Sequence, residues 1–428
     1  MAILPSKFNT LRLLGLADKV LVLDEVHAYD AYLRTEVKAL LRFQASLGGS
    51  AILLSATIPR KLRAELVREW RNVVTPPPVR SLWSTRPEPD GVQRTEYPLA
   101  TVISASETTE APVESASWSK REVSVRFVHA DRDAVERIVA AANAGCAVAW
   151  VRNTVDTCRA AAEDIRRHGI EPIVFHARFA QCDRQAREAE VTDLFGKGKD
   201  GARRGRVLIA TQVIEQSLDI DFDFMVSDLA PIDLLIQRAG RLWRHKDRSR
   251  PITSGPELVV LSPRFTEAPD DDWLKALLPH TDLIYGSVDV LWRTLRALLK
   301  TNKIVTPDGL RDLIEEVYAG DECPRNLMER ADRALAAEGA ALATAGYVAL
   351  KPEGGYSGEV TTWLSDTHVP TRLGEEQVVL RLGRVMHDGR IEPWAETDGP
   401  AWERWSLSEV RVTSRWFPPG SSVDRRYA

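Results

Sequence analysis

Long apolar runs, paired cysteines and an excess of positive charge are all missing from this 428-residue chain. No stretch approaches the roughly 20 apolar residues that cross a bilayer, and no leader peptide is recognisable, so we expect a cytoplasmic protein with no membrane contact. The 4 cysteines are far apart and form no C-x-x-C pair, which disfavours a zinc site or a disulfide framework. The net charge of −4 argues against a globally basic nucleic-acid binder but permits a local basic groove.

A further absence concerns phosphate binding. The loop G-x-x-x-x-G-K-[ST], whose backbone amides cradle nucleotide phosphates, occurs nowhere in the 428 residues. Gly196-Lys197 comes nearest, but Gly198 follows where a hydroxyl residue is needed. The chain therefore lacks the loop that commonly binds the β- and γ-phosphates of a nucleotide.

What is present is an ordinary globular composition, with 44% hydrophobic and 28% charged residues, in a chain long enough for two or three domains. A strand at 20–23, a helix at 32–46 and a strand at 51–54 predict parallel α/β architecture that begins abruptly, as if its first half were missing.

A second and more complete α/β set follows. We expect strands at 123–128, 147–151, 172–175, 206–209 and 224–228, and helices at 134–143, 155–168, 184–195 and 234–245. Residues 104–119, rich in Ser, Thr, Glu and Ala, predict a mobile linker or insertion. Residues 271–346 look all-helical, and the tail from Tyr347, with a strand at 378–382 and five of the 12 tryptophans, predicts a small domain whose tryptophans form a core or stack on bases.

The first candidate site is Asp24-Glu25-Val26-His27, directly after a buried strand. Adjacent carboxylates at the carboxyl end of such a strand suit a hydrated Mg²⁺ ion, held by Asp24 through water, and a water activated by Glu25. His27 would couple the site to a neighbouring domain. The alternative is a pair of solvated acids and a surface histidine.

Short polar segments follow two further strands. Ser55-Ala56-Thr57 comes one strand after the acids, where Ser55 and Thr57 could bridge the acidic site and a domain cleft; both could equally cap a helix. Thr211 and Gln212 follow the strand at 206–209 and suit a nucleic-acid phosphate. Asp219 suits a ribose hydroxyl, unless it is only a surface acid among Asp221 and Asp223.

The segment 237–244, Gln-Arg-Ala-Gly-Arg-Leu-Trp-Arg, is the strongest single signal. Arg238, Arg241 and Arg244 recur every three residues, on or near one face of the expected helix. Planar guanidiniums neutralise charge on a transferring phosphoryl group, so Gln237, Arg241 and Arg244 are candidate catalytic residues and Arg238 a nucleotide contact. Together with the acid pair, the segment predicts a nucleic-acid-dependent NTPase motor.

Two weaker signals remain. Arg178, beside Phe179 at a strand end, could grip a single strand of DNA. Residues 196–206 form a glycine-rich basic loop that we expect to be solvated, with nucleic-acid contact as the minor alternative.

Taken together, residues 24–27, 55–57, 211–219 and 237–244 resemble motifs II, III, V and VI of superfamily two helicases. The flanking residues 16–30, the run 212–219 and the Leu-Trp-Arg-His ending at 242–245 narrow the resemblance to the CRISPR-associated helicase-nuclease of type I systems. The resemblance covers essentially the whole chain.

That resemblance implies an α/β fold with an incomplete first RecA-like domain at 1–78, a linker or insertion at 79–122, a complete second RecA-like domain at 123–265, a helical linker at 266–346 and a small C-terminal domain at 347–428. It implies ATP and Mg²⁺ as cofactors. The implied partners are single-stranded DNA and an RNA-guided surveillance (Cascade) complex, which recruits the motor.

The sequence departs from the family pattern in lacking the HD nuclease and the Walker A half of the first RecA-like domain. We therefore expect the chain alone neither to hydrolyse ATP appreciably nor to cut DNA, and to need the missing half from another chain. Two alternatives stay open: a non-catalytic DNA-binding or docking module, and an unrelated RNA helicase fragment.

Overall fold

The computed structural model describes residues 9–26, 31–56, 58–75, 92, 94–104, 106–116, 119–198, 201–215, 218–320, 322–333 and 377–413. The chain divides into two compact units. Unit 1 comprises residues 1–121 and 305–373, and unit 2 comprises residues 122–304 and 374–428. The predicted domain boundaries stay predictions.

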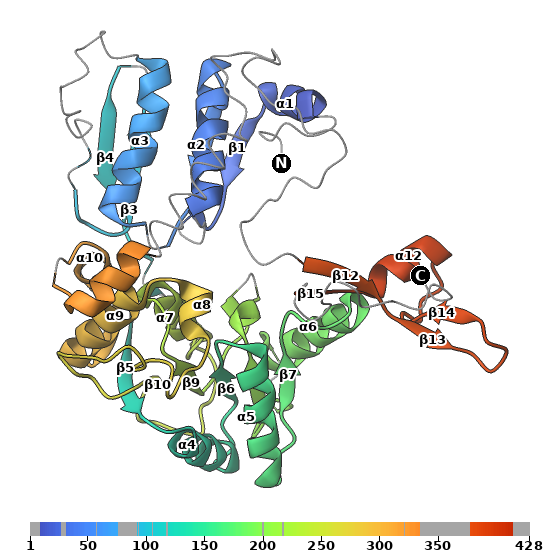
Figure 1. Ribbon diagram of the computed structural model, residues 1–428. Coiled ribbons are helices and arrows are strands. Elements are labelled where there is room, and N and C mark those ends of the chain that lie inside the picture. The colour runs from blue at the N-terminus through green and yellow to red at the C-terminus, as the bar shows by residue number, and fades with distance from the viewer. Residues whose placement is uncertain are drawn as a thin grey trace. The chain divides into compact units, whose positions relative to one another are not determined.

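Unit 1 is built on two parallel strands, β1 (Val20–Leu23) and β2 (Ser50–Leu53), paired in register from Val20↔Ser50 to Leu23↔Leu53. Its helices within the described residues include α1 (Asn9–Ala17), α2 (Ala31–Ser46), α3 (Arg60–Val74) and, later in the chain, α10 (Leu310–Tyr318) (Figure 1). Alternation along the strands directs one set of side chains to the helices, and the resulting core contains Leu21, Val26, Val37, Leu41, Leu62 and Leu66. The expected strand–helix–strand order is confirmed.

Of the two expectations for residues 104–119, a mobile linker is wrong for the part that pairs in a hairpin, whereas an insertion stays a prediction. Strands β3 (Leu99–Ile103) and β4 (Thr108–Pro112) form an antiparallel hairpin. Glu110 holds the hairpin to the rest of unit 1, because it accepts from Thr101 Oγ1 at 3.1 Å and pairs with the buried Arg63 at 3.4 Å. Composition suggested a linker, and these cross-strand contacts override it.

Unit 2 contains a seven-stranded sheet in the order β11-β5-β10-β9-β6-β8-β7. Every strand pair that β5, β6, β7, β8, β9 and β10 form with one another is parallel. The bounds are β5 (Arg121–Val128), β6 (Val148–Val151), β7 (Ile173–Phe175), β8 (Val207–Ala210), β9 (Phe224–Asp228), β10 (Glu257–Leu261) and β11 (Lys303–Thr306).

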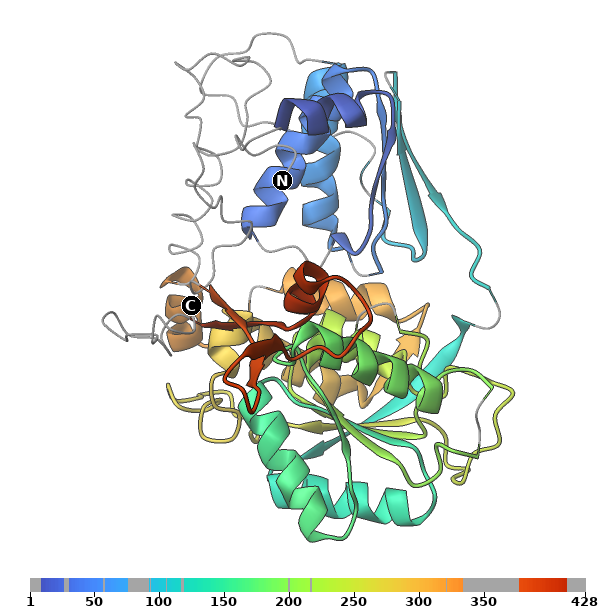
Figure 2. The ribbon, with the colours of Figure 1, turned by 90° about the vertical axis from the view of Figure 1, so that its right-hand side faces the viewer.

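The central strands are buried along their whole length, as expected for a parallel sheet covered on both faces. Helices α4 (Asp131–Asn143) and α5 (Val155–Arg167) lie on one face, and α6 (Gln181–Phe195) lies on the other (Figure 2). This arrangement follows from right-handed crossovers, since the chain moves along the sheet in one direction before β7 and in the other after it.

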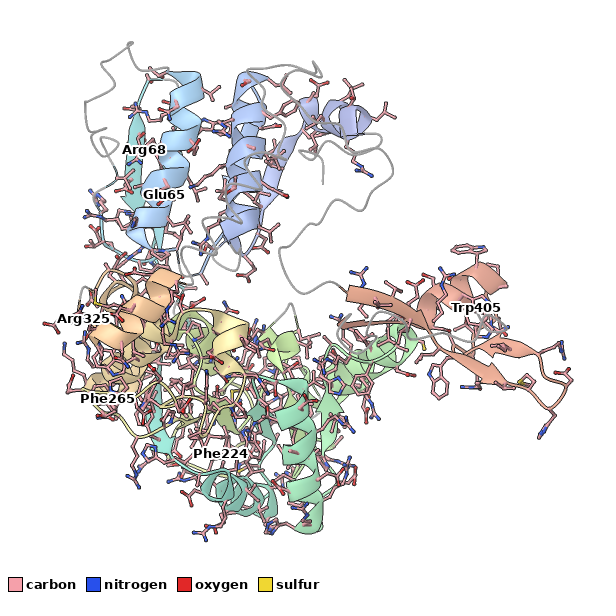
Figure 3. The ribbon with its side chains drawn as sticks, viewed as in Figure 1. Glu65, Arg68, Phe224, Phe265, Arg325 and Trp405 are labelled. Atoms are coloured by element: carbon pink, nitrogen blue, oxygen red, sulfur yellow. The ribbon has the colours of Figure 1, made fainter. Side chains whose placement is uncertain are left out.

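Several predicted elements end differently or are interrupted. Helix α7 (Ile232–Ala239) stops six residues before the predicted end at 245. The region predicted as all-helical contains α8 (Thr281–Tyr285), α9 (Val288–Thr301) and α10 (Leu310–Tyr318) but also strand β11. The ring of Phe265, labelled in Figure 3, lies 5.3 Å from that of Trp292 in α9, so α9 is part of the unit 2 core.

The C-terminal residues assigned to unit 2 contain two antiparallel pairs, β12 (Gln377–Arg381) with β15 (Glu409–Thr413) and β13 (Gly383–Val385) with β14 (Ile391–Pro393), plus α12 (Ala401–Leu407). The strand expected at 378–382 is confirmed. Trp394 Nε1 donates to Asp183 Oδ2 of α6 at 2.9 Å, whereas Trp402 is 73% exposed. One tryptophan docks and another faces solvent, which keeps both expected roles open.

None of the helices in the described ranges combines the length and the apolar composition needed to span a bilayer.

Candidate nucleotide and DNA site

The acid pair and Ser55 lie at the same edge of the β1–β2 sheet. Leu54 N donates to Leu23 O at 2.8 Å, and Val26 N donates to Leu54 O at 3.2 Å. These bonds continue the strand pairing past the ends of both strands, so the loop 24–26 runs beside residues 54–55. Asp24 and Glu25 are exposed and Ser55 is half-buried, which leaves the two carboxylates accessible to a ligand.

Glu25 adopts a left-handed backbone conformation, with φ of 53°. For a residue other than glycine this costs about 1–3 kcal/mol and persists where the surroundings hold it. Val26, only 1% exposed, anchors the next residue in the core of unit 1, and Glu25 N donates to Asp24 Oδ1 at 2.9 Å. Backbone strain therefore falls on the residue predicted to activate water.

Two of the predicted coupling residues, His27 and Thr57, lie outside the described residues. Within the described ranges, no group of three or more His, Cys, Asp or Glu side chains could enclose a metal ion. A single exposed carboxylate such as that of Asp24 fits a Mg²⁺ ion that keeps most of its waters and binds nucleotide phosphates.

The residues predicted to contact DNA follow neighbouring strands of unit 2. Thr211 and Gln212 come directly after β8, and Arg178 comes three residues after β7. Thr211 N donates to Phe175 O of β7 at 3.1 Å, which fixes the two strand ends together. Carboxyl ends of parallel strands meet at one edge, where ligands of open α/β sheets bind. The structure therefore brings these three residues to one edge of the sheet.

Arg178 lies next to a histidine whose charge is suppressed. His176 is 6% exposed, stacks on Phe179 at 4.2 Å and accepts from Arg178 N through Nδ1 at 3.2 Å. Burial, reinforced by the positive charges of Arg178 and Arg159, lowers the pKa of His176 from 6.5 to about 4. A neutral ring leaves Arg178 as the cation at this strand end.

His176 should make the fold acid-sensitive. As pH falls, the unfolded chain binds a proton near pH 6.5, whereas the folded chain binds it near pH 4, so stability is lost across that window. Between pH 7 and pH 5 the loss attributable to His176 is about 2 kcal/mol. Urea unfolding of the wild type and His176→Asn at both pH values measures it, with His168→Asn at the exposed end of α5 as control. An equal pH dependence in all three proteins would contradict the prediction.

Arg241 and Arg244 do not lie on a helix, which corrects the expected helical face. Phe222 N donates to Arg241 O at 2.9 Å and Trp243 N donates to Phe222 O at 3.0 Å. These bonds draw the chain after Gly240 into a short parallel bridge between Phe222 and Leu242. The guanidiniums are therefore presented from a turn that is tied to the residues before β9.

The two arginines instead contact the segment that precedes β9. Arg241 donates through Nη1 to Leu218 O and through Nη2 to Glu215 O at 3.1 Å. Arg244 Nε donates to Asp219 Oδ1 at 2.7 Å. The predicted catalytic arginines and the predicted ribose-binding acid are thus neighbours in unit 2.

Asp219 is shared between two donors, because His245 Nε2 also lies 3.1 Å from Oδ1. Partial burial alone would raise its pKa, but the hydrogen bonds from Arg244 and His245 outweigh burial and hold the pKa of Asp219 below its ordinary value. The carboxylate stays ionised at neutral pH. It is exposed, so a ligand hydroxyl could approach it.

Asp221 and Asp223 are not the surface acids that the sequence suggested. They are 0% and 1% exposed and pair with the buried guanidiniums of Arg203, Arg248 and Arg250. Arg203 belongs to the loop expected to be solvated, so that expectation is wrong at this position.

This ion cluster also fixes the turn that carries the predicted catalytic arginines. Arg244 N donates to Asp221 Oδ1 at 2.6 Å, and Trp243 Nε1 donates to Asp223 O at 3.0 Å. The sequence carried no signal for this set, since its members are spread over 203–250 without regular spacing.

Arg238 and Gln212 take part in internal contacts. Arg238 is fully buried and donates to Glu215 Oε1 at 2.7 Å and Ser227 Oγ at 2.8 Å. Gln212 Nε2 donates to Asn153 O at 2.9 Å. In this structure Arg238 positions the segment 211–215 and is not available to a ligand; its contact with a nucleotide stays a prediction. Gln237 lies half-buried in α7.

A family profile described as "CRISPR-associated nuclease/helicase Cas3, C-terminal" matches residues 144–247, a range that includes Thr211, Asp219 and the segment 237–244. The CRISPR-associated endonuclease/helicase Cas3 of Escherichia coli K12 is 34% identical over 326 residues, which is 74% of this chain and 35% of that protein. The protein of the same name from Thermus thermophilus is 33% identical over 389 residues, 79% of this chain and 39% of that protein.

This chain is Cas3-like. Among solved structures, T. fusca Cas3 with ATP matches at a TM-score of 0.80 and 27% identity, covering 96% of this chain and 49% of that one. A chain in a "CRISPR RNA-guided surveillance complex, pre-nicking" matches at 0.79 and 27%, covering 96% of this chain and 52% of that one. The chain thus spans about a third of the length of these two curated Cas3 relatives and about half of the length of these two solved chains.

Proposed function

We propose that this chain is the helicase portion of a CRISPR interference motor. As part of the complete motor it would use ATP to move along single-stranded DNA and unwind the duplex, after recruitment by an RNA-guided surveillance complex. The observation that carries this proposal is the junction in unit 2 where Arg241 and Arg244 contact the segment 215–219, within the range that matches Cas3. Support comes from the similarity to Cas3 in an ATP complex and to a chain in a surveillance complex.

The catalytic roles follow from side-chain chemistry. Glu25 would orient and deprotonate the attacking water, and Asp24 would hold Mg²⁺ through water. When bound, that ion neutralises charge on the phosphates. Arg241 and Arg244 would stabilise charge on the transferring phosphoryl group, with Gln237 near the γ-phosphate.

The remaining predicted residues divide between nucleotide, DNA and coupling. Asp219 would accept from a ribose hydroxyl. Arg238, predicted as a nucleotide contact, is buried and would instead hold the segment 211–215 in place. Thr211, Gln212 and Arg178 would contact the DNA backbone. His27, Ser55 and Thr57 would couple the nucleotide site to the DNA site.

The β1–β2 sheet supports the proposal that further strands complete the first RecA-like domain. Val20, Val22, Ile52 and Leu54, on the face away from the core, are each 48–57% exposed. A two-stranded sheet with one apolar face in water is marginal on its own. We propose that this face packs against the segment of the motor that carries the phosphate-binding loop and the HD nuclease.

A non-catalytic DNA-binding or docking module is the second candidate. The observation favouring it is that the 428 residues contain no G-x-x-x-x-G-K-[ST] loop. Such a module would bind single strands or the surveillance complex and would never hydrolyse ATP.

An ATPase assay separates the two candidates. The purified chain alone is expected to give no DNA-stimulated hydrolysis, and hydrolysis should appear on mixing with a polypeptide that carries the phosphate-binding loop and the rest of the motor from the same organism. Glu25→Gln should abolish the restored activity, since the amide cannot accept the proton of the attacking water. Robust hydrolysis by the chain alone would refute its dependence on a second segment, and no activity after verified assembly would favour the docking module.

Binding to single strands should depend on salt. Each phosphate neutralised releases counterions, so log K is expected to fall with log salt with a slope of about −0.7 per phosphate contacted. Fluorescence anisotropy with labelled single-stranded DNA gives this slope when it is repeated between about 50 and 200 mM salt. Replacing Arg178 by alanine should reduce the magnitude of the slope by about 0.7, the contribution of one phosphate contact. A strong preference for RNA in a competition experiment would contradict the DNA assignment.

A further inference from the structure

One buried hydroxyl joins the two segments that the proposed function depends on. Tyr285, the last residue of α8, donates through its hydroxyl to Asn153 Oδ1 at 3.0 Å. The same oxygen accepts from Arg238 Nη2 at 3.1 Å and Gln212 Nε2 at 3.4 Å. Tyr285 lies outside the range 144–247 that matches the Cas3 profile.

The three partners come from separate parts of the sheet. Asn153 follows β6, Gln212 follows β8 and begins the short 3-10 helix η3 (Gln212–Glu215), and Arg238 lies in α7. A single phenol oxygen therefore links the segment predicted to contact DNA with the helix that leads to the predicted catalytic arginines.

Further hydrogen bonds close this network around the hydroxyl. Asn153 Nδ2 donates to Leu229 O at 2.9 Å and to Thr281 Oγ1 at 3.2 Å, so Asn153 is itself held by the residue after β9 and by the first residue of α8. Arg238 Nε donates to Glu215 Oε1 at 2.7 Å. Both ends of η3 are thereby attached to the network.

The charges suit a tyrosine that remains a hydrogen-bond donor. Burial raises the pKa of the Tyr285 hydroxyl, although the Arg238 charge opposes that rise. The hydroxyl thus stays protonated at neutral pH and can satisfy Asn153 Oδ1, while its oxygen satisfies a buried guanidinium nitrogen. A buried network with all members satisfied is rigid, and one missing member leaves several groups unpaired.

We propose that Tyr285 is a positioning residue that holds η3 and α7 in one fixed arrangement, through which binding of single-stranded DNA at η3 sets the geometry of the catalytic arginines. This inference rests on the proposed function. Tyr285 touches neither ATP nor DNA in this scheme and acts through Gln212 and Arg238.

Hydrogen–deuterium exchange tests the positioning without requiring any activity. In Tyr285→Phe the ring remains and the hydroxyl is lost. The variant loses the hydrogen bond from the charged Arg238 and leaves Asn153 Oδ1 without the hydroxyl donor. Backbone amides in 212–215 and 232–239 should therefore exchange about tenfold faster. Exchange in α4 and α5 should stay unchanged.

Trp273→Phe is the matched control. It removes another buried hydrogen bond, from Trp273 Nε1 to Arg264 O at 2.9 Å, in the stretch that leads to α8 but outside the network. If Trp273→Phe accelerates exchange at 212–215 as much as Tyr285→Phe does, or if neither does, Tyr285 is not a positioning residue and the inference is overturned.

Anisotropy with single-stranded DNA then tests the link to function. Tyr285→Phe should raise the Kd for DNA about fivefold, while Trp273→Phe leaves it unchanged. If the hydroxyl acts through Gln212, the double variant Tyr285→Phe/Gln212→Ala should bind DNA no more weakly than Gln212→Ala alone. Fully additive losses would overturn that route. If the wild type binds no single strand, the proposed function fails, and the exchange result alone still decides the role of Tyr285.

Discussion

Replacing Arg241 by alanine is expected to lower the ATP turnover of the assembled motor by about a thousandfold or more. A guanidinium placed against the transferring phosphoryl group stabilises charge that develops only in the transition state, so its loss should reduce kcat far more than it raises KM. Steady-state ATPase assays with saturating single-stranded DNA measure both constants.

The structure adds a second contribution to this effect. Arg241 donates to the backbone carbonyls of Glu215 and Leu218, so alanine also removes the contacts that hold these two residues. Lysine restores the charge but not the planar fork that reaches two carbonyls. We therefore expect Arg241→Lys to remain severely impaired, which distinguishes a geometric requirement from one for charge alone.

Arg325→Ala provides the control for removal of an arginine. Its side chain is 93% exposed and extends from the ribbon in Figure 3, and its pairing with Glu329 is a surface contact worth less than about 1 kcal/mol. Turnover should equal that of the wild type. An Arg241→Ala motor with more than about a tenth of wild-type kcat would contradict the assignment of Arg241 as an arginine finger.

The parallel sheet of unit 2 was predictable because its strands are short apolar runs separated by amphipathic helices. Strand β6, with the sequence Val-Ala-Trp-Val, has no exposed residue, and such runs have one stable location in an α/β layer. The end of α7 was not predictable in the same way. The periodic arginines continue to Arg244, but backbone bonds from Phe222, which is remote in sequence, redirect the chain at Gly240.

The residues of the candidate site likewise fall into those that a local pattern reveals and those that only long-range contacts define. Asp24 and Glu25 directly follow β1, so their position at the end of that strand could be read from the local pattern. Residues that hold those motifs in place could not, because a buried polar side chain is defined by partners far along the chain. Tyr285 carries no local signal at all, and its partners lie 47 to 132 residues away.

Asp223→Ala is expected to destabilise unit 2 by about 3–5 kcal/mol, the cost of breaking a buried ion pair from one side. Asp223 Oδ1 lies 3.1 Å from Arg203 Nη1 and 2.7 Å from Arg250 Nη1, and Oδ2 accepts from Ala147 N at 2.7 Å. Alanine would leave the three buried guanidiniums of the cluster with Asp221 as their one carboxylate. Burial already lowers the pKa of Arg203, and Asp223 is the leading charge that opposes this.

Urea unfolding followed by tryptophan fluorescence measures the loss, and two further variants separate its causes. Asp223→Asn keeps an oxygen for Ala147 N but removes the charge, so the difference between it and Asp223→Ala reports the hydrogen bond. Asp164→Ala removes a carboxylate whose partner, Arg167, is 73% exposed, and should cost less than about 1 kcal/mol. If Asp223→Ala lowers the free energy of unfolding no more than Asp164→Ala does, water is replacing the missing carboxylate. The ion cluster would then not be what holds the turn that carries Arg241 and Arg244.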